Sequence, residues 1–273
     1  MVSLARPRAS TQATTVSPTP WLWAGAGLVV GLLASSVLHA PAHWLARAVA
    51  LASGERVLLR QAQGSVWSGS SELVLTGGLG SADAVRLPGT LHWDIRPQLG
   101  GLQLQVRADC CTPQPLRLDL HWLRWNGVQV TLADHQSNWP ADLLSGLGTP
   151  WNTVQVRGQL SATSQGLQLH WTPGQLQLQG QLVLDAQSIA SRLSTLVPMG
   201  SYRLTIAGGA SPSVLLQTLS GSLQLEGQGQ WVGQRLRFSG VASAAPERVE
   251  ALSNLLNIVG RRDGARSFIT LGS

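Results

Sequence analysis

An alternation of apolar and polar residues runs through most of the chain from Val57 onward, and it constrains the fold more than any other feature. The stretch 102–107 reads Leu-Gln-Leu-Gln-Val-Arg, and 116–122 reads Leu-Arg-Leu-Asp-Leu-His-Trp. Successive side chains of a strand point to opposite faces of a sheet, so this pattern predicts strands with one buried and one solvated face, as in antiparallel sheets. The same alternation returns at 128–130, 154–157, 167–171, 176–179, 223–226 and 236–238.

Turn residues stand between these stretches, as three glycine pairs and one Pro-Gly pair. They are Gly77-Gly78, Gly100-Gly101, Gly208-Gly209 and Pro173-Gly174. We therefore predict a mainly β fold of about a dozen strands in one large antiparallel sheet, built as a curved sheet or a sandwich.

Three short helical patterns interrupt the strands. The first covers 140–146, the second covers 185–197 before Pro198, and the third covers 246–259. In the third pattern the apolar residues recur at the spacing of one helix face, so we expect that helix to lie on the sheet. The stretch 267–271 predicts a last strand near the end of the chain.

An internal similarity suggests that the β-rich region, 55–273, arose by duplication. Residues 73–78 followed by 87–94 resemble residues 204–209 followed by 219–226, with a spacing that differs by one residue. Two duplicated β halves, 55–145 and 146–273, are therefore one hypothesis for its organisation.

The stretch Trp21–Leu38 contains no charged residue and no proline. Its 18 residues would form a helix of about 27 Å, close to the hydrocarbon core of about 30 Å. Arg6 and Arg8 precede it, and no acidic residue occurs before Glu55, so the positive-inside bias places the N-terminus in the cytoplasm. We expect a single-pass transmembrane helix over 21–38. The residues expected to anchor it are Trp21, Trp23, Leu28, Val29, Leu32, Leu33 and Leu38.

Two other interpretations of this stretch stay open. The triplet 40–42, Ala-Pro-Ala, fits the small-residue rule for signal-peptide cleavage, although the regions before it are longer than usual. A buried core helix is the second alternative, although Trp21 and Trp23 suit the headgroup region of a membrane better. With an uncleaved anchor, residues 1–20 form a disordered cytoplasmic tail and 39–54 form a helix that leaves the membrane.

The charge composition argues against nucleic-acid binding. The formal net charge is +6, and all 19 basic residues are arginines. They are scattered along the chain with a single pair at Arg261-Arg262, whereas a nucleic-acid site needs a clustered basic patch. We therefore expect no nucleic-acid partner.

The two cysteines, Cys110 and Cys111, are neighbours in the sequence. A bridge between them is expected to be strained, because neighbouring Cα atoms lie about 3.8 Å apart and disulfides prefer about 4.4–6.8 Å. We interpret the pair as a turn or strand-end feature, with a redox or intermolecular role as the alternative.

Catalytic motifs are missing from the sequence. The six histidines and 13 acidic residues are dispersed, and no nucleophile motif, phosphate-binding loop or metal-ligand spacing occurs. We therefore expect no enzyme, no catalytic residue, no cofactor and no metal site. Eleven tryptophans are many, and most fit strand patterns as core residues, with a Trp-lined carbohydrate or lipid groove as the alternative.

Five stretches resemble protein N of the bacterial type II, or general, secretion pathway. They are GSVWSG from Gly64, GLGTPWNT from Gly146, SRLSTL from Ser191, GQRLRFSG from Gly233 and NLLNIVGRRDGARS from Asn254. The last is the most specific, and with the N-terminal anchor the resemblance covers about residues 21 to 273.

The resemblance implies a non-enzymatic, single-pass protein of the inner membrane with most of its chain in the periplasm. It would assist the assembly or operation of the machine that exports folded proteins across the outer membrane. Its implied partners are inner-membrane platform subunits of that machine, the outer-membrane secretin, and membrane lipid through the N-terminal helix. The family supplies no catalytic residues to carry over.

Three arginines in the most specific stretch are candidates for binding a partner, namely Arg261, Arg262 and Arg266. They could bind an acidic group of a partner or cap the negative end of the helix predicted before them, and we favour the cap.

Two further functions stay open beside the secretion role. A long one-sided sheet is also similar to AsmA-like envelope proteins, which implies binding or transfer of lipid in a hydrophobic β groove. An envelope hydrolase acting on glycans rests only on the tryptophan count, and the sequence offers no evident carboxylate pair for that chemistry.

Overall fold

The computed structural model describes residues 19–123, 127–173, 175–233 and 235–272, and the side chains of residues 19, 20 and 22 lie outside this description. The chain forms two compact units, Met1–Ala40 and Pro41–Ser273. The predicted cytoplasmic tail, 1–20, falls outside the described residues except at its last two positions.

The first unit contains one helix, α1 (Thr19–Leu38), as the apolar stretch predicts. All seven predicted anchor residues lie on this helix, and they are exposed by 54% at Val29 up to 79% at Trp21. Counting described residues only, no helix reaches both the length and the apolar character that crossing a membrane requires.

The second unit is built on one antiparallel sheet, which confirms the mainly β prediction. Over the described residues the sheet has 16 strands, and its main path runs β1-β2-β4-β5-β6-β7-β9-β10-β11-β12-β13-β14-β16-β15, while β3 pairs with β2 and β8 with β9. The strands are β1 (Val57–Gly64), β2 (Ser68–Thr76), β3 (Ala84–Arg86), β4 (Leu91–Gln98), β5 (Gly101–Ala108), β6 (Leu116–Leu123), β7 (Gly127–Leu132), β8 (His135–Pro140), β9 (Val156–Thr172), β10 (Gln175–Ser191), β11 (Gly200–Ala207), β12 (Ser213–Gly221), β13 (Leu223–Val232), β14 (Arg235–Ala244), β15 (Arg261–Asp263) and β16 (Arg266–Leu271).

The register of the strands places the alternating apolar residues on one face. Leu102 of β5 lies opposite Leu120 of β6, which lies opposite Val130 of β7, followed by Leu169 of β9 and Leu178 of β10. Directly paired residues share a face, so these five form one apolar row across five strands. A slip of one residue would turn each strand's apolar set to the other face, which is why the alternation holds the register.

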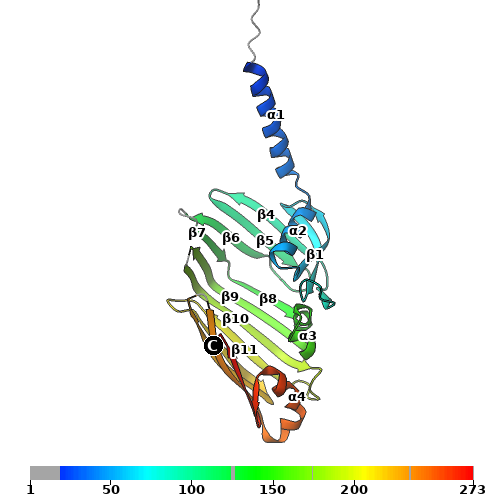
Figure 1. Cartoon of the computed structure of the whole chain (residues 1–273), viewed down its shortest axis with the longest axis vertical. Coiled ribbons are helices and arrows are strands. Elements are labelled where there is room, and N and C mark those ends of the chain that lie inside the picture. The colour runs from blue at the N-terminus through cyan, green and yellow to red at the C-terminus, as the bar shows by residue number, and fades with distance from the viewer. Residues whose placement is uncertain (1–18, 124–126, 174, 234, 273) are drawn as a thin grey trace, which may run out of the picture. The chain divides into compact units, whose positions relative to one another are not determined.

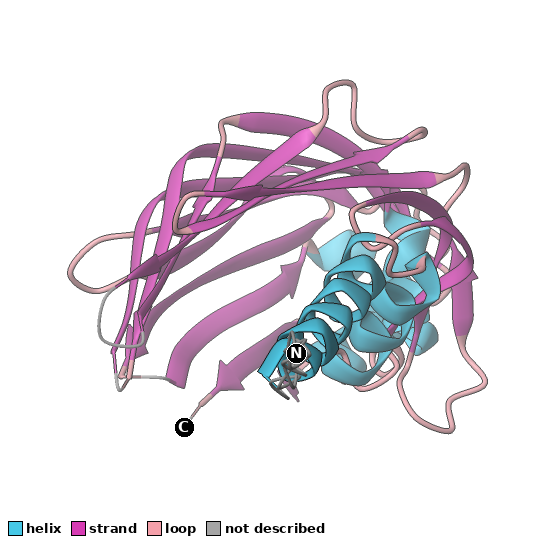
Figure 2. Ribbon diagram, turned by 90° about the horizontal axis from the view of Figure 1, so that it is seen from above, coloured by secondary structure: helices cyan, strands magenta, loops and turns pink. Residues whose placement is uncertain are grey.

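A second apolar row continues the same face through the C-terminal strands. It runs from Leu182 of β10 through Ile206, Val214 and Gly229 to Phe238 of β14, each residue directly opposite the next. Figure 2 shows that the sheet curls into an arch, and the helices of this unit pack on its inner side. The apolar face is therefore the concave face of the sheet.

Short helices cover one end of this concave face. They are α2 (Ala42–Ala52), η1 (Ala141–Leu147), α3 (Trp151–Val154), η2 (Pro246–Arg248) and α4 (Val249–Val259). Figure 1 shows α2, α3 and α4 along one margin of the sheet, while hairpin ends form the opposite margin. The positions of η1 and α4 confirm the helices predicted at 140–146 and 246–259. Helix α2 lies within the stretch 39–54, and its predicted role as the helix that leaves the membrane stays a prediction.

Helix α4 shows how the covered end is built. Leu252, Leu255 and Leu256 follow helical spacing and are at most 3% exposed, because they lie on Leu223 and Ala242 of the sheet. A second cluster, around Leu87 and Leu143 of η1, buries the concave face under the N-terminal strands.

The helix predicted at 185–197 is wrong. Residues up to Ser191 continue strand β10, and Ala186 pairs with Leu160 of β9 on one side and with Tyr202 of β11 on the other. Two apolar neighbouring strands therefore override the helical preference of this stretch, and a bulge with Ser188 at φ 50° accounts for the break in its alternation.

Candidate functional site

The concave face is not covered along its whole width, and its uncovered part is a candidate site in the second unit. Trp122 of β6 lies opposite Val128, which lies opposite Trp171 of β9, which lies opposite Leu176 of β10. Trp122 is 57% exposed, Trp171 47% and Leu176 46%, although all belong to the apolar face. These residues lie at the hairpin ends, where no described helix packs.

A hollow of about 530 Å³ lies on this uncovered part of the face. Its apolar wall consists mainly of Leu169, Leu176, Leu178, Leu182, Ile206 and Trp231. Ala210 and Pro212, from the loop between β11 and β12, also line it, as do the uncharged polar residues Gln175 and Gln177. We call this hollow, together with the exposed row of Trp122 and Trp171, the open groove.

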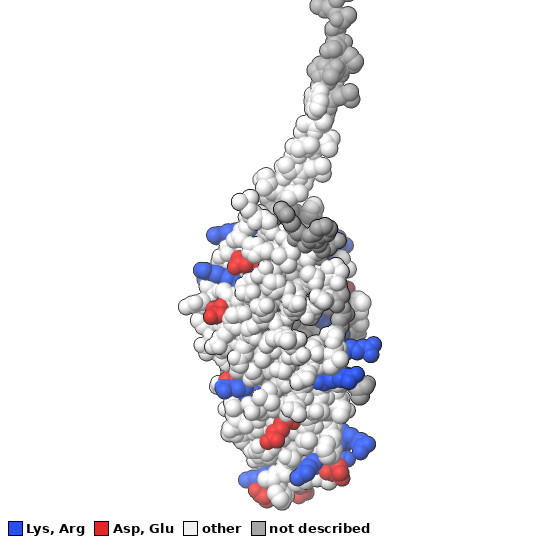
Figure 3. Space-filling model, turned by 90° about the vertical axis from the view of Figure 1, so that its left-hand side faces the viewer, with Lys and Arg blue, Asp and Glu red and all other residues white. Residues whose placement is uncertain are grey.

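The open groove carries no charged side chain in its wall. Charged residues of the same strands point to the convex face, where Arg203 of β11 donates two hydrogen bonds to Asp185 of β10 at 2.7 and 2.8 Å. The hydrogen bonds from Arg203 lower the pKa of the Asp185 carboxyl. Figure 3 views the unit from the side of the hairpin ends and shows uncharged residues over most of that surface.

The three candidate arginines do not form one cluster. Arg262 lies opposite Ser267 on the face that carries α4, and its guanidinium donates to Ser253 Oγ at 2.7 Å and to Asn257 Oδ1 at 3.0 Å. Arg261 and Arg266 alternate with it and point to the other face, where both are exposed. Arg262 is therefore hydrogen-bonded to side chains of α4, whereas Arg261 and Arg266 are exposed at the edge of the sheet.

The two cysteines are bonded to each other in the turn between β5 and β6, with Cα atoms 3.7 Å apart. The turn interpretation is confirmed, and the bridge forms although the Cα spacing argued against it. Cys111 is buried, and its carbonyl oxygen accepts a hydrogen bond from the Asn138 backbone N–H at 2.8 Å. The pair is therefore built into the packing of the turn.

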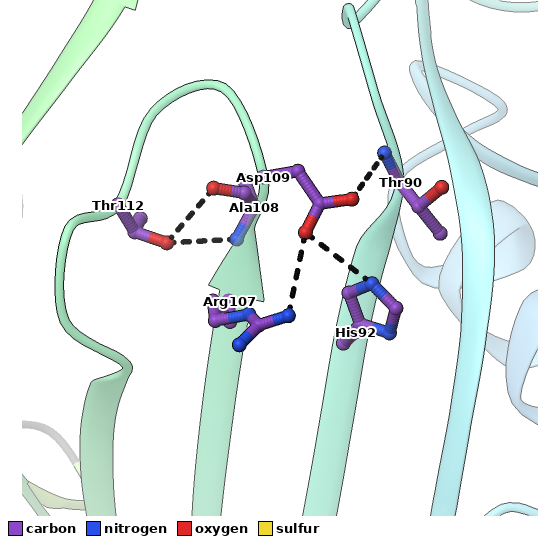
Figure 4. A network of polar contacts seen from close by, with 6 residues as sticks. All are labelled: Thr90, His92, Arg107, Ala108, Asp109 and Thr112. Carbon is purple, nitrogen blue, oxygen red and sulfur yellow. Dashed lines mark hydrogen bonds and ion pairs between the residues drawn. The ribbon is translucent and has the colours of Figure 1, made fainter.

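Figure 4 shows the polar contacts that hold this turn. The Asp109 carboxylate accepts a hydrogen bond from the Thr90 backbone N–H at 3.2 Å and lies 3.4 Å from His92 Nε2 and 3.5 Å from an Arg107 nitrogen. The hydrogen bond from Thr90 lowers the pKa of Asp109, desolvation opposes this effect, and the contacts with His92 and Arg107 add to it. Thr112 Oγ1 accepts from the Ala108 backbone N–H at 2.8 Å. These contacts fix the turn between neighbouring strands.

The described part of the chain shows no cluster of side chains suited to binding a metal ion. No group of three or more His, Cys, Asp or Glu side chains is placed there to hold a metal ion.

The sequence suggested a hydrophobic groove as an alternative, but it did not identify the residues that form the wall of that groove. The exposed row from Trp122 to Leu176 depends on which residues of β6, β7, β9 and β10 face each other, and only strand order and register decide that. The Pro173-Gly174 turn was a usable signal, because a tight hairpin there pairs Trp171 with Leu176.

A family model described as type II secretion system protein N matches residues 55–269. The match begins just before β1 and ends within β16, so it covers the whole sheet apart from the last residues of that strand and includes α4 and the three arginines. No curated protein and no solved structure matches the chain significantly. The resemblance found in the sequence motifs is confirmed over most of the chain, which therefore belongs to the type II secretion system protein N family.

Proposed function

We propose that this protein is a non-enzymatic subunit of the type II secretion machine, held in the inner membrane, which assists the machine's assembly or operation. The observation that carries the proposal is the family match over residues 55–269, which coincides with the sheet of the second unit. Residues in this unit with unusual pKa values, such as Asp109 and Asp185, are explained by hydrogen bonds that hold strands and turns together.

The proposed topology rests on the sequence of the stretch 21–38. It is uncharged, tryptophans stand at its start, and arginines precede it. In this proposal residues 1–20 lie in the cytoplasm, 39–54 leave the membrane as a helix, and 55–273 form the periplasmic domain. The exposed apolar side chains of α1, such as Leu28 and Leu32, would then face lipid.

The proposed docking site for other subunits is the edge of the sheet at β15 and β16. A strand at the edge offers unpaired backbone groups to a partner strand. Arg261 and Arg266 are exposed beside Phe268, which is 41% exposed, and Asp263 is exposed opposite Arg266 on the same face. This edge therefore offers two positive charges, one negative charge and an apolar contact together. Acidic segments of the inner-membrane platform subunits or of the secretin suit such an edge.

The test of the secretion role is deletion of the gene in a strain with an active type II system, followed by measurement of exported enzymes in the medium. We expect secretion to fall and the full-length chain to restore it. Normal secretion by the deletion strain, with a correctly assembled machine, would contradict the proposal.

The docking edge can be tested by photocrosslinking in living cells. A photoreactive residue replaces Arg261, and the matched control carries it at Gln179, which is exposed on the convex face far along the sheet. We expect adducts with platform subunits or secretin from position 261 and few from position 179. Equal adducts from both positions would argue against this edge.

The anchor can be tested with Leu28→Arg combined with Leu32→Arg. Two charges in the middle of an 18-residue span are costly in lipid, at about 2.5–3.5 kcal/mol each on insertion scales. We expect the variant to leave the membrane fraction. Retention of the variant in membranes after washing at high pH would show that this stretch is not the anchor.

A further inference from the structure

The open groove is an apolar surface that the chain's described residues leave uncovered. Its row of Trp122, Trp171 and Leu176 exposes between 46% and 57% of each side chain, and the hollow of about 530 Å³ continues it. Contiguous apolar surface of this kind marks a binding site more often than a monomer surface. We propose that the open groove binds the acyl chain of a phospholipid. This inference goes beyond the secretion role and does not depend on it.

The backbone of the groove favours a hydrocarbon ligand over a peptide. The strands under the groove, β6, β7, β9, β10 and β11, are each paired on both sides, so their N–H and C=O groups are used in the sheet. An extended peptide in the groove would leave its own backbone groups without partners, which costs free energy in an apolar site. An acyl chain has no such groups.

The size of the hollow also suits a lipid tail. A volume of about 530 Å³ falls within the range of about 300–1,000 Å³ that small-molecule sites occupy.

The span of the exposed row agrees with the length of a lipid tail. Four neighbouring strands from β6 to β10 are separated by three steps of about 4.8 Å, which makes about 14 Å from Trp122 to Leu176. Half of a hydrocarbon core of about 30 Å, which is the depth of one leaflet, is about 15 Å. A tail that crosses these strands would therefore be covered along most of its length.

The distribution of charge matches a phospholipid as well. The wall of the hollow has no charged residue, as an acyl chain requires. At the margin of the hollow, Trp231 lies near the β13–β14 hairpin and opposite Leu236 of β14. Indole rings are groups that meet phospholipid headgroups at membrane surfaces. The headgroup phosphate would lie at this hairpin margin, with the tail directed into the hollow.

The experiment uses the full-length chain in nanodiscs that contain phosphatidylglycerol with a photoreactive group in its acyl chain. After illumination, peptides are mapped by mass spectrometry. We expect adducts on residues of the groove wall, on β9 and β10 in particular, separately from any adducts on α1. Adducts on α1 alone, or on the convex face as often as on the groove, would overturn the proposal.

Matched variants make the result specific. Leu176→Arg places a charge in the groove, while Gln179→Arg places the same charge on the convex face of the same strand, at an exposed residue that does not line the hollow. We expect the first to lower groove labelling about tenfold and the second to leave it within about twofold, because a buried charge opposes an apolar ligand. Leu176→Ser serves in the same comparison if the arginine variant does not fold. Equal labelling of the folded variants and the wild type would overturn the proposal, and so would a copurified peptide found crosslinked in the groove.

Discussion

The two ends of the concave face are built from the same strands and the same alternation, yet they differ in what covers them. On β13, Leu223 at the helix-bearing end is 2% exposed, whereas Trp231, on the same face at the hairpin end, is only partly buried. On β10, Ala186 faces Tyr202 in the core cluster, whereas Leu176 is nearly half exposed. A strand pattern thus specifies which face is apolar, but a separate element must bury it.

The covered end supplies the stability of the second unit, and the open end supplies surface for a ligand. Burial of apolar area stabilises a fold by about 25 cal/mol per Å², so residues under α4 contribute far more than residues in the groove. Substitutions at the two ends should therefore separate stability from binding.

The largest effect is expected from Leu256→Ala under α4. Leu256 is 0% exposed, and its loss leaves a cavity in the largest core cluster. We expect the free energy of unfolding to fall by about 2–5 kcal/mol. Urea unfolding of the full chain in nanodiscs, followed by circular dichroism of the β signal, measures it. A loss below about 1 kcal/mol would mean that α4 does not hold the covered end.

A smaller effect is expected from Tyr202→Phe. The Tyr202 hydroxyl is buried and donates to the Leu223 carbonyl oxygen at 3.2 Å, across the strand β12 that lies between them. Removal of the hydroxyl leaves that carbonyl without this donor, so we expect a loss of about 1 kcal/mol, measured in the same unfolding experiment. An unchanged free energy of unfolding would show that a water molecule replaces the Tyr202 hydroxyl as the donor to this carbonyl. Water would then reach this part of the core although the residues around it are buried.

The sequence predicted the strands well because alternation is a local signal. The strands around 102–107 and 116–122, the helix α4 and the final strand all lie where the pattern placed them. The stretch 185–197 failed because its strand character comes from neighbours on β9 and β11, which are distant in sequence. A helical spacing of apolar residues cannot reveal such neighbours.

The candidate site was harder to predict from the sequence, because it too depends on which strands lie side by side, and those strands are distant in the sequence. Arg261, Arg262 and Arg266 looked like one group, but the period of two in β15 and β16 turns Arg262 toward α4 and the others away. The open groove needs both the register of its strands and the absence of a covering helix among the described residues. The proposed duplication into halves 55–145 and 146–273 stays a prediction.

A pH effect on stability is expected from His135. His135 begins β8 opposite Ser164, which is buried, and burial lowers the pKa of His135 below 6.5. The folded state then binds the proton less readily than the unfolded chain, so stability is complete above about pH 6.5 and falls as pH drops through that value. We expect a lower unfolding midpoint at pH 5 than at pH 8.

The control for this pH effect is His135→Gln, which removes the titrating group. The difference in midpoint between pH 5 and pH 8 should become smaller in this variant. If the difference stays the same, other groups cause it, and His92 beside Asp109 is then the next histidine to replace.

The smallest effect on stability is expected from Leu176→Ser at the open end. Leu176 is 46% exposed and its neighbours in the groove are half exposed or open to solvent, so we expect a change within about 0.5 kcal/mol. Thermal and urea unfolding of the full chain measure it beside Leu256→Ala. A loss as large as that of Leu256→Ala would mean that the hairpin end is covered in the folded protein, by a second copy or another segment, and the contrast between the two ends would fail. A small loss together with weaker acyl-chain labelling would show instead that the same apolar face serves stability at one end and binding at the other.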